Sequence, residues 1–567
     1  MPEIDPITFE VVRNALLTTA AEMKVVVMRA SYSTIWRESG DLSCAILSRD
    51  GDMIAQGPGD LPAHLATMPF SLKGALQKIP LDTLEPGDVL FHNDPQWGNN
   101  HLPDCMMAKP VFVDHVIIGF AVVRGHWTDI GGMGAGSYTA VTTDPIQEGL
   151  RIPPLKLYRR GVLDQSYVDL ILANVRVPRD RLGDIRAEYA GCVTGERKLL
   201  ALAAKYGART VVDCMQAILD HGEQLTRAEI AQISDGTYHY TDYSDGDGVT
   251  DEPIKIQVAV TITGSDVMVD FSGSHAQTIG GMNCPLAVTY SSVQFAIKAA
   301  ADPWNPANSG CYRPVQVTAP LGTVVNPVLP ASVVAGNHET AMIIVSAMFG
   351  ALAQAAPERV IAAGSDSSVV TVIGGTDPRP ERRGRKYVYI EVHGSAWGAS
   401  QRGDGVSVMR AGVGNTGNQP IEVVETEYPV TVLEYAMVAD RAGAGQRRGG
   451  VPLRRVIRLQ AEAQVSLIAE RGRIAPYGLL GGQPGALGEY RMNPGTPQEE
   501  RLFSKTAPLP RQRGDILSIC AAGGGGFGDP QQRHPEAIRR DIEAGLVSPE
   551  AALRDYGTQR AGKISVA

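Results

Sequence analysis

Two imidazoles and two carboxylates in the first quarter of the chain have types and spacing that suit a metal site. His101 and Asp104 lie three residues apart, a spacing that puts both side chains on one side of a turn, which Pro103 stiffens. His126 ends a predicted strand that could run back past them, and Asp41 lies upstream. Such a donor set suits zinc, manganese or iron(II), and a bound cation can lower the pKa of a water or polarise a carbonyl. Spacing alone leaves a second interpretation open, in which all four are hydrogen-bonded loop residues.

The segment around these residues is rich in histidine and tryptophan. Five of the eleven histidines lie between residues 64 and 126, and three of the five tryptophans (Trp36, Trp97 and Trp127) flank the same motifs. Large apolar rings beside histidine and aspartate predict a closed polar pocket. His115 is expected instead to be exposed in a turn between two strands.

Four other motifs are weaker candidates for a binding or catalytic site. Asp129–Gly132 resembles half of an actin-type phosphate loop, but Met133 stands where a threonine would help, which favours a tight glycine turn. Asp242–Gly248 lacks the acidic twelfth residue of a calcium loop, and Gly523–Gly528 lacks the Lys-Ser/Thr pair of a phosphate loop. We therefore predict an ordinary acidic turn for Asp242–Gly248 and close backbone packing for Gly523–Gly528. Asn337–Thr340 either caps a helix or faces a ligand. The sequence contains neither a serine-hydrolase G-x-S-x-G motif nor an H-E-x-x-H zinc motif.

Composition and charge exclude several classes of protein. The net charge is -9 and no basic run of five or more residues occurs, so nucleic-acid binding is poorly supported. The seven cysteines are scattered without a C-x-x-C pair, which predicts reduced thiols rather than disulfides or a cysteine zinc site. The N-terminus does not resemble a secretory signal, and no run of about 18 apolar residues suggests a membrane span. We therefore expect a cytoplasmic protein that binds neither membrane nor nucleic acid.

The secondary-structure pattern predicts an α+β protein with several lobes. Helices are expected over 7–29, 69–78, 188–233, 287–301 and 340–355 and as a pair over 536–556; strands over 43–56 (a hairpin), 89–92, 106–113, 116–124, 255–262 and 267–271; and short strands with glycine-rich turns over 421–488. Because one core rarely exceeds about 300 residues, we divide the chain. The parts are a mixed N-terminal metal-binding lobe (1–234), a β-rich lobe with helical insertions (235–430), a β-rich C-terminal lobe (431–530) and a helical tail (531–567).

The order of motifs along nearly the whole chain resembles the hydantoinase B/oxoprolinase family. That family includes β subunits of ATP-dependent hydantoinases and caprolactamase, the C-terminal half of 5-oxoprolinase, and subunits of acetone and acetophenone carboxylases. The motifs that carry the resemblance are Asp5–Val11, Glu38–Asp41, His92–Pro95, His101–Asp104, Gly183–Ala187, Asp270–Ser274, Gly336–Thr340 and Gly523–Pro530. The resemblance implies a divalent metal, zinc ahead of manganese or iron, held by Asp41, His101, Asp104 and His126. One departure is Gly98–Asn100, where relatives often have Gly-Gly-x, which leaves the loop shape open.

The resemblance also implies a partner subunit and a separate role for each of the two subunits. ATP and magnesium would bind in a separate subunit of actin-like fold (hydantoinase A type), in an α2β2 or larger assembly. That partner would phosphorylate the substrate's amide or carbonyl oxygen, which turns the oxygen into a good leaving group before water attacks on this subunit. His64, His92 and Asp94 lie close in sequence to the expected ligands, and each is a candidate general base or a residue that orients a ligand.

Four functions remain open at this point. The first is the metal-binding subunit of an ATP-dependent cyclic amidohydrolase acting on a hydantoin, a lactam or 5-oxoproline. The second is a subunit of an ATP-dependent ketone carboxylase, although such relatives are typically longer chains. The third is a non-catalytic scaffold for the ATPase subunit, and the fourth is a metalloamidase that acts alone. The sequence does not identify the substrate.

Overall fold

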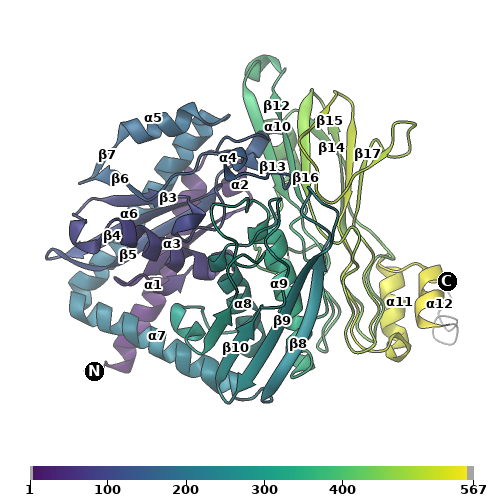
Figure 1. Ribbon diagram of the computed structural model, residues 1–567, viewed down its shortest axis with the longest axis horizontal. Coiled ribbons are helices and arrows are strands. Elements are labelled where there is room, and N and C mark those ends of the chain that lie inside the picture. Colours follow the sequence, from purple (N-terminus) through teal and green to yellow (C-terminus); the bar gives the residue numbers. More distant parts are fainter. Residues whose placement is uncertain (1–3, 411, 558–567) are drawn as a thin grey trace.

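The computed structural model describes residues 4–410 and 412–557, in which helices are combined with four sheets (Figure 1). This arrangement confirms the α+β class. A seven-stranded sheet comes first in the chain and a four-stranded sheet second, and two sheets whose strands alternate in sequence form the C-terminal part.

The N-terminal sheet is antiparallel throughout and carries most of the candidate site. Its strand order is β2-β1-β5-β4-β3-β6-β7, with β1 (Leu42–Leu47), β2 (Met53–Gln56), β3 (Val89–His92), β4 (Asp104–Val113), β5 (Val116–His126), β6 (Leu155–Arg159) and β7 (Val162–Leu163). Asp114 and His115 form the β4–β5 turn with φ angles of 48° and 64°. His115 is exposed there, as expected. The predicted hairpins are confirmed.

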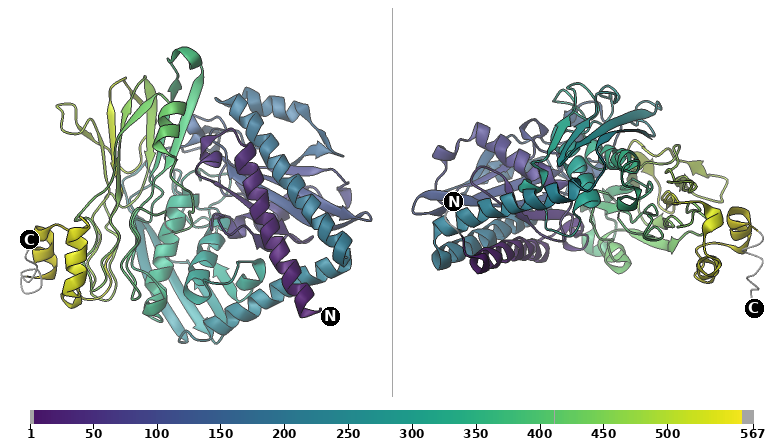
Figure 2. Two further views of the ribbon diagram at one scale, coloured as in Figure 1. Left: turned by 180° about the vertical axis from the view of Figure 1, so that it is seen from behind. Right: turned by 90° about the horizontal axis from the view of Figure 1, so that it is seen from below.

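Helices cover both faces of this sheet. The helices of this part of the chain are α1 (Pro6–Ala30), α2 (Thr34–Arg37), α3 (His64–Lys78), α4 (Pro145–Glu148), α5 (Gln165–Ala173), α6 (Pro178–Tyr206) and α7 (Ala208–Ile230). The long helices α1, α6 and α7 lie along one side of the molecule (Figure 2). The Asp5 carboxylate caps α1 by accepting a hydrogen bond from the Thr8 amide at 2.8 Å.

Two helix boundaries differ from the sequence prediction. The helix expected over 69–78 begins at His64, because Pro69 lies in the second turn and does not start it. The helix expected over 188–233 begins at Pro178 and is two helices, α6 and α7, separated at Gly207 with a φ of 87°.

A second sheet packs on two buried helices in the middle of the chain. Its order is β11-β10-β9-β8, with β8 (Gly236–Ser244), β9 (Ile254–Thr263), β10 (Asp266–Asp270) and β11 (Val315–Thr318). Buried and partly exposed residues alternate along β9, so one face of the sheet covers α9 (Ala341–Leu352). Helix α8 (Leu286–Ala301) lies against both α9 and α3, which links this sheet to the N-terminal lobe.

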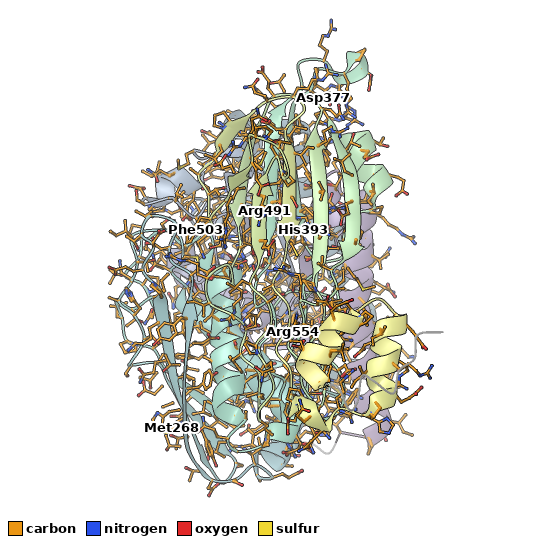
Figure 3. All side chains as sticks on the ribbon, turned by 90° about the vertical axis from the view of Figure 1, so that its right-hand side faces the viewer. Met268, Asp377, His393, Arg491, Phe503 and Arg554 are labelled. Carbon is orange, nitrogen blue, oxygen red and sulfur yellow. The ribbon has the colours of Figure 1, made fainter. Side chains whose placement is uncertain are left out.

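The C-terminal half contains two sheets that share one apolar core. The first has the order β13-β12-β16-β19 and the second β14-β15-β20-β17-β18, with β12 (Val370–Thr376), β13 (Lys386–Val392), β14 (Val430–Met437), β15 (Leu453–Leu459), β16 (Ala463–Ile468), β17 (Glu489–Met492), β18 (Glu500–Arg501), β19 (Leu509–Arg511) and β20 (Ile516–Cys520). Asp377 follows β12 at one end of the molecule and Met268 of β10 lies at the other (Figure 3). The prediction of strands from residue 421 onward is wrong at the start of that range, where Ile421–Glu427 forms helix α10.

The glycine run and the tail match their predictions. A Cβ atom on Gly524 would lie 1.9 Å from the carbonyl oxygen of Trp397, so backbones meet there without side chains between them. The tail forms α11 (Pro535–Glu543) and α12 (Pro549–Tyr556). All seven cysteines are buried free thiols. Among residues 4–410 and 412–557, no helix is long and apolar enough to cross a membrane.

The largest apolar core runs across the predicted boundary at residue 234. It includes Val27 of α1, Ile185 of α6, Val258 of β9 and Ile343 of α9. The division of the chain into four parts stays a prediction.

Candidate metal centre

Three side chains predicted to hold a metal converge in the N-terminal lobe. The Oδ1 atom of Asp104 lies 3.0 Å from Nε2 of His101 and 3.2 Å from Nδ1 of His126. The two ring nitrogens lie 3.3 Å apart. All three side chains are buried, and their donor atoms form a small triangle.

The dimensions of this triangle fit a single coordinated cation. Two ligands about 2.0–2.1 Å from a tetrahedral zinc ion are roughly 3.4 Å apart. The separations of 3.0, 3.2 and 3.3 Å are close to that spacing. Imidazole and carboxylate donors suit zinc, manganese and iron(II), so the residues present fit the divalent cation that the sequence predicted.

The β4–β5 hairpin sets the position of two of the three donors. Asp104 begins β4, His126 ends β5, and the two are directly paired across the strands. The Trp36 indole donates to the His126 carbonyl at 2.8 Å and packs over Gly125, where a Cβ atom would lie 2.5 Å from its ring. A bulkier residue before His126 would therefore displace the indole.

Asp41, the fourth predicted ligand, lines the same cavity. Its carbonyl accepts a hydrogen bond from the His126 amide at 3.1 Å, which ties the start of β1 to the end of β5. Burial raises the pKa of the Asp41 carboxyl, and the negative charge of Asp104 adds to that increase, whereas His126 opposes it. A cation held between these groups would favour the ionised form of Asp41.

Asp104 is the most heavily hydrogen-bonded member of the site. Burial alone would raise its pKa, but the neighbouring imidazoles of His101, His126 and His64 hold the pKa of Asp104 well below its usual range. The Oδ2 atom of Asp104 accepts a hydrogen bond from the side-chain amide of Asn100. The Oδ1 atom of Asn100 in turn accepts from the buried guanidinium of Arg124. These contacts keep Asp104 ionised and fix its orientation.

His101 is oriented by a segment far along the chain. Its Nδ1 donates to the carbonyl of Val334 at 3.1 Å, which directs the lone pair of Nε2 toward Asp104 and His126. The Glu148 carboxylate, at the end of α4, accepts from the Val333 and Val334 amides at 2.7 and 3.1 Å and from the Ser332 hydroxyl. A buried acid therefore holds the segment that orients His101.

The three candidate general bases have different locations. His64 lines the cavity, with Nε2 lying 3.2 Å from Oδ2 of Asp104 and Nδ1 2.8 Å from the Ser43 hydroxyl. His92 donates to the Ser71 carbonyl at 3.1 Å, outside the cavity lining, and burial lowers its pKa to about 3. Asp94 instead accepts from the Gln96 amide. The structure thus brings only His64, of these three, to the cavity wall.

Other residues complete the cavity lining, and most of them lie in segments that the sequence did not single out. Tyr138 packs edge-on against His101 and His126 and stacks on His338 at a ring distance of 5.2 Å. His338 belongs to Asn337–Thr340, the motif with two open interpretations, and it lines the cavity. Arg410 and the apolar residues Val370, Ile390 and Val392 complete the wall from the C-terminal half. The pocket therefore lies between the N-terminal lobe and the β12–β13 pair.

Comparison with known proteins identifies the family. A family model described as hydantoinase B/oxoprolinase matches residues 5–530. The chain belongs to the hydantoinase B/oxoprolinase family. This family member is 32% identical to the beta chain of the caprolactamase of Pseudomonas jessenii, over 98% of its own length and 96% of the relative. It is also 32% identical to a protein of Pseudomonas sp. (strain NS671) assigned as the B-type component of a D-/L-hydantoinase, over 98% and 95% of the two chains.

Solved structures support the same relationship. The ATP-dependent caprolactamase of Pseudomonas jessenii superposes on this family member with a TM-score of 0.90 at 31% identity, covering 98% of this chain and 96% of the other. Acetone carboxylase superposes with a TM-score of 0.88 at 20% identity, covering 97% and 79%. The second likeness concerns the fold alone.

Proposed function

We propose that this chain is the metal-binding subunit of an ATP-dependent amidohydrolase that opens a cyclic amide such as a hydantoin, a lactam or 5-oxoproline. The observation that carries the proposal is the convergence of His101, Asp104 and His126 at 3.0–3.3 Å in a chain related to caprolactamase and hydantoinase subunits. Asp41 is the proposed fourth ligand because it lines the same cavity.

A divalent cation would supply Lewis acidity to this pocket and lower the pKa of a water molecule. The donor set suits zinc, manganese and iron(II), and zinc is proposed first because of the family resemblance. The protein's own contribution is to keep Asp104 ionised, to direct Nε2 of His101 toward the other donors and to pack the Tyr138 ring against both ligand imidazoles. Polar groups act more strongly in such a closed pocket than in water.

His64 is proposed to position Asp104. Both of its ring nitrogens have polar neighbours, the Ser43 hydroxyl and the Asp104 carboxylate. Burial lowers the pKa of His64, so a neutral ring with one N–H can donate to Asp104. The general base stays unassigned between His64, His92 and Asp94, although His92 and Asp94 lie outside the cavity lining.

ATP is proposed to bind in a separate ATPase subunit of hydantoinase A type. Two relatives are themselves named as subunits, and this sequence contains no complete phosphate-binding loop. Amide resonance makes the ring carbonyl a poor electrophile, and phosphorylation of its oxygen by the partner removes that resistance. Addition of one water to the activated carbon and breakage of the ring C–N bond would release the amine and leave an acyl phosphate. A second water would then give the ring-opened acid and phosphate, while ADP is the other product in the partner.

The test is an assay of the two-subunit complex. We would co-purify the chain with its ATPase partner and screen hydantoins, lactams, 5-oxoproline and small ketones with and without ATP and bicarbonate. ATP-dependent ring opening that is lost in the Asp104→Ala variant supports the proposal. Bicarbonate-dependent consumption of a ketone would instead support the carboxylase function. Ring opening that survives Asp104→Ala would support a scaffold role.

A further inference from the structure

The cavity beside the metal centre is also lined by a cationic side chain from the other half of the chain. Arg410 lines the same cavity as Asp104 and His126. We propose that Arg410 binds an oxyanion of the substrate next to the cation. This inference rests on the proposed function and adds to it the way in which the substrate is held.

The contacts of Arg410 leave part of its guanidinium available. Its Nη2 donates to the Ser368 hydroxyl at 2.8 Å. Its Nε and Nη1 atoms are buried, yet within the described part of the chain they have no hydrogen-bond partner. Burying a charged donor without a partner is unfavourable, so an anion that accepts from both nitrogens would satisfy the site.

Neighbouring residues restrict the position of the Arg410 guanidinium. The Trp397 indole donates to the Arg410 carbonyl at 3.1 Å, which fixes the residue's main chain. A Cβ atom on Gly414 would lie 2.1 Å from Nε of Arg410, so only glycine leaves room for the side chain where it is. Arg410 is therefore held in place before any ligand binds.

Two further polar atoms on the same wall are unpaired among the described residues. The Nδ1 atom of His338 contacts Glu339 at 2.7 Å, and its ring stacks on Tyr138, whereas its Nε2 atom is buried without a partner among the described residues. The Oδ1 atom of Asn337 is unpaired in the same sense. These atoms surround one polar space, and the apolar side chains of Val370, Ile390 and Val392 line the rest of it.

Neither of the two nearby carboxylates is a hydrogen-bond partner of the Arg410 guanidinium. Asp41 and Glu339 interact with it electrostatically, but neither forms a hydrogen bond with it among residues 4–410 and 412–557. Glu339 accepts instead from the Ser368 amide at 2.8 Å. Asp41 lines the same cavity as Asp104 and His126 and interacts electrostatically with both, and a cation held there would pair with it. The guanidinium thus remains the group suited to an incoming oxyanion.

The oxyanion has two chemical sources in the proposed reaction. One is the phosphoryl group placed on the amide oxygen, and the other is a carboxylate that the substrate or the ring-opened product carries. Either presents oxygen acceptors that match the planar donors of arginine. Held at Arg410, the group would lie in the cavity that Asp104 and His126 also line.

The experiment measures binding of inorganic phosphate to the complex of this chain with its ATPase partner, loaded with Mn²⁺ and without nucleotide. Relaxation of the phosphorus nucleus by Mn²⁺ reports phosphate near the metal centre. We compare the unchanged protein with Arg410→Gln, Arg410→Lys and Arg402→Gln, an exposed arginine in a neighbouring turn that serves as the matched control. Acetate is added as a competitor to separate the two sources.

Phosphate should bind at least about tenfold more weakly in Arg410→Gln and be partly restored in Arg410→Lys, with Mn²⁺ content and Arg402→Gln binding unchanged. Displacement by excess acetate points to a carboxylate, and resistance to it points to a phosphoryl group. Equal relaxation in Arg410→Gln and the unchanged protein overturns the inference. Gly414→Ala, which displaces the guanidinium without removing it, should also weaken phosphate binding. Because no turnover is needed, failure of the proposed ring opening is detected separately in the activity assay.

Discussion

Asp104 and His126 face each other as the terminal pair of the β4–β5 ladder, with Oδ1 and Nδ1 3.2 Å apart. Residues that are 22 positions apart in sequence thus meet because the hairpin returns the chain to its starting point. The register of the ladder therefore sets the geometry of the two donors, and the exposed turn at Asp114 and His115 lies at the far end from the site.

The first prediction concerns Glu148, which acts on the metal centre through Val334. Replacing Glu148 with alanine removes the acceptor for two backbone amides and the Ser332 hydroxyl, so the Val334 carbonyl should lose its position against His101. We expect metal affinity to fall about 10- to 100-fold. Competition with a chromogenic chelator measures it.

Two further variants make the Glu148 prediction specific. Glu148→Gln keeps one acceptor oxygen and should lose less affinity than Glu148→Ala. Ile146→Ala changes an exposed side chain of the same helix and should leave the affinity as it was. Equal affinity in Glu148→Ala and Ile146→Ala would show that Glu148 does not position the ligand.

The glycine run in the C-terminal half predicts an effect on stability. Gly524→Ala places a Cβ atom 1.9 Å from the Trp397 carbonyl oxygen, so the two backbone segments must separate. Overpacking of this kind costs typically about 1–3 kcal/mol or more. The midpoint of thermal unfolding should fall clearly. In Gly403→Ala, where the added atom meets nothing within 4 Å, the midpoint should stay near that of the unchanged protein.

The pH dependence of stability should reveal the buried carboxyl of Asp60. Burial raises its pKa from 3.8 to about 6, although Lys24 lies 3.1 Å away and the Cys44 amide donates to it. An acid whose folded-state pKa is raised stabilises the fold when protonated, and that contribution is lost as the pH rises through about 6. The difference in unfolding free energy between the unchanged protein and Asp60→Asn should therefore shrink by up to about 3 kcal/mol from pH 4 to pH 7. Denaturant titrations across that range measure it, and a constant difference would contradict the assignment.

Local patterns made much of the N-terminal lobe predictable. The alternation of strands around Asp114 and His115 predicted the hairpin, and the spacing of His101 and Asp104 predicted a shared turn. The structure brings those two residues together with His126, because hairpin pairing and a tight turn are local in sequence. The same kind of pattern gave a wrong prediction for residues 421–427. Their β-branched residues predicted a strand, but they form a short helix between a loop and β14.

The rest of the pocket was not predictable because it depends on contacts between distant segments. Arg410 lies 306 positions after Asp104, and nothing in its immediate sequence marks it as facing a cavity. His338 was recognisable only as part of a motif with two open interpretations. The carbonyl of Val334 orients His101 through its backbone, and a backbone contact of this kind leaves no trace in residue type.

The central claim is that His101, Asp104 and His126 hold one divalent cation. The most direct measurement is the metal content of the purified chain and its Co²⁺ absorption spectrum, for the unchanged protein, Asp104→Ala, His126→Ala and His115→Ala. We expect about one ion per chain, with a ligand-field spectrum, in the unchanged protein and in His115→Ala, and loss of both in the other two variants. Full metal content and an unaltered cobalt spectrum in Asp104→Ala and His126→Ala would contradict it.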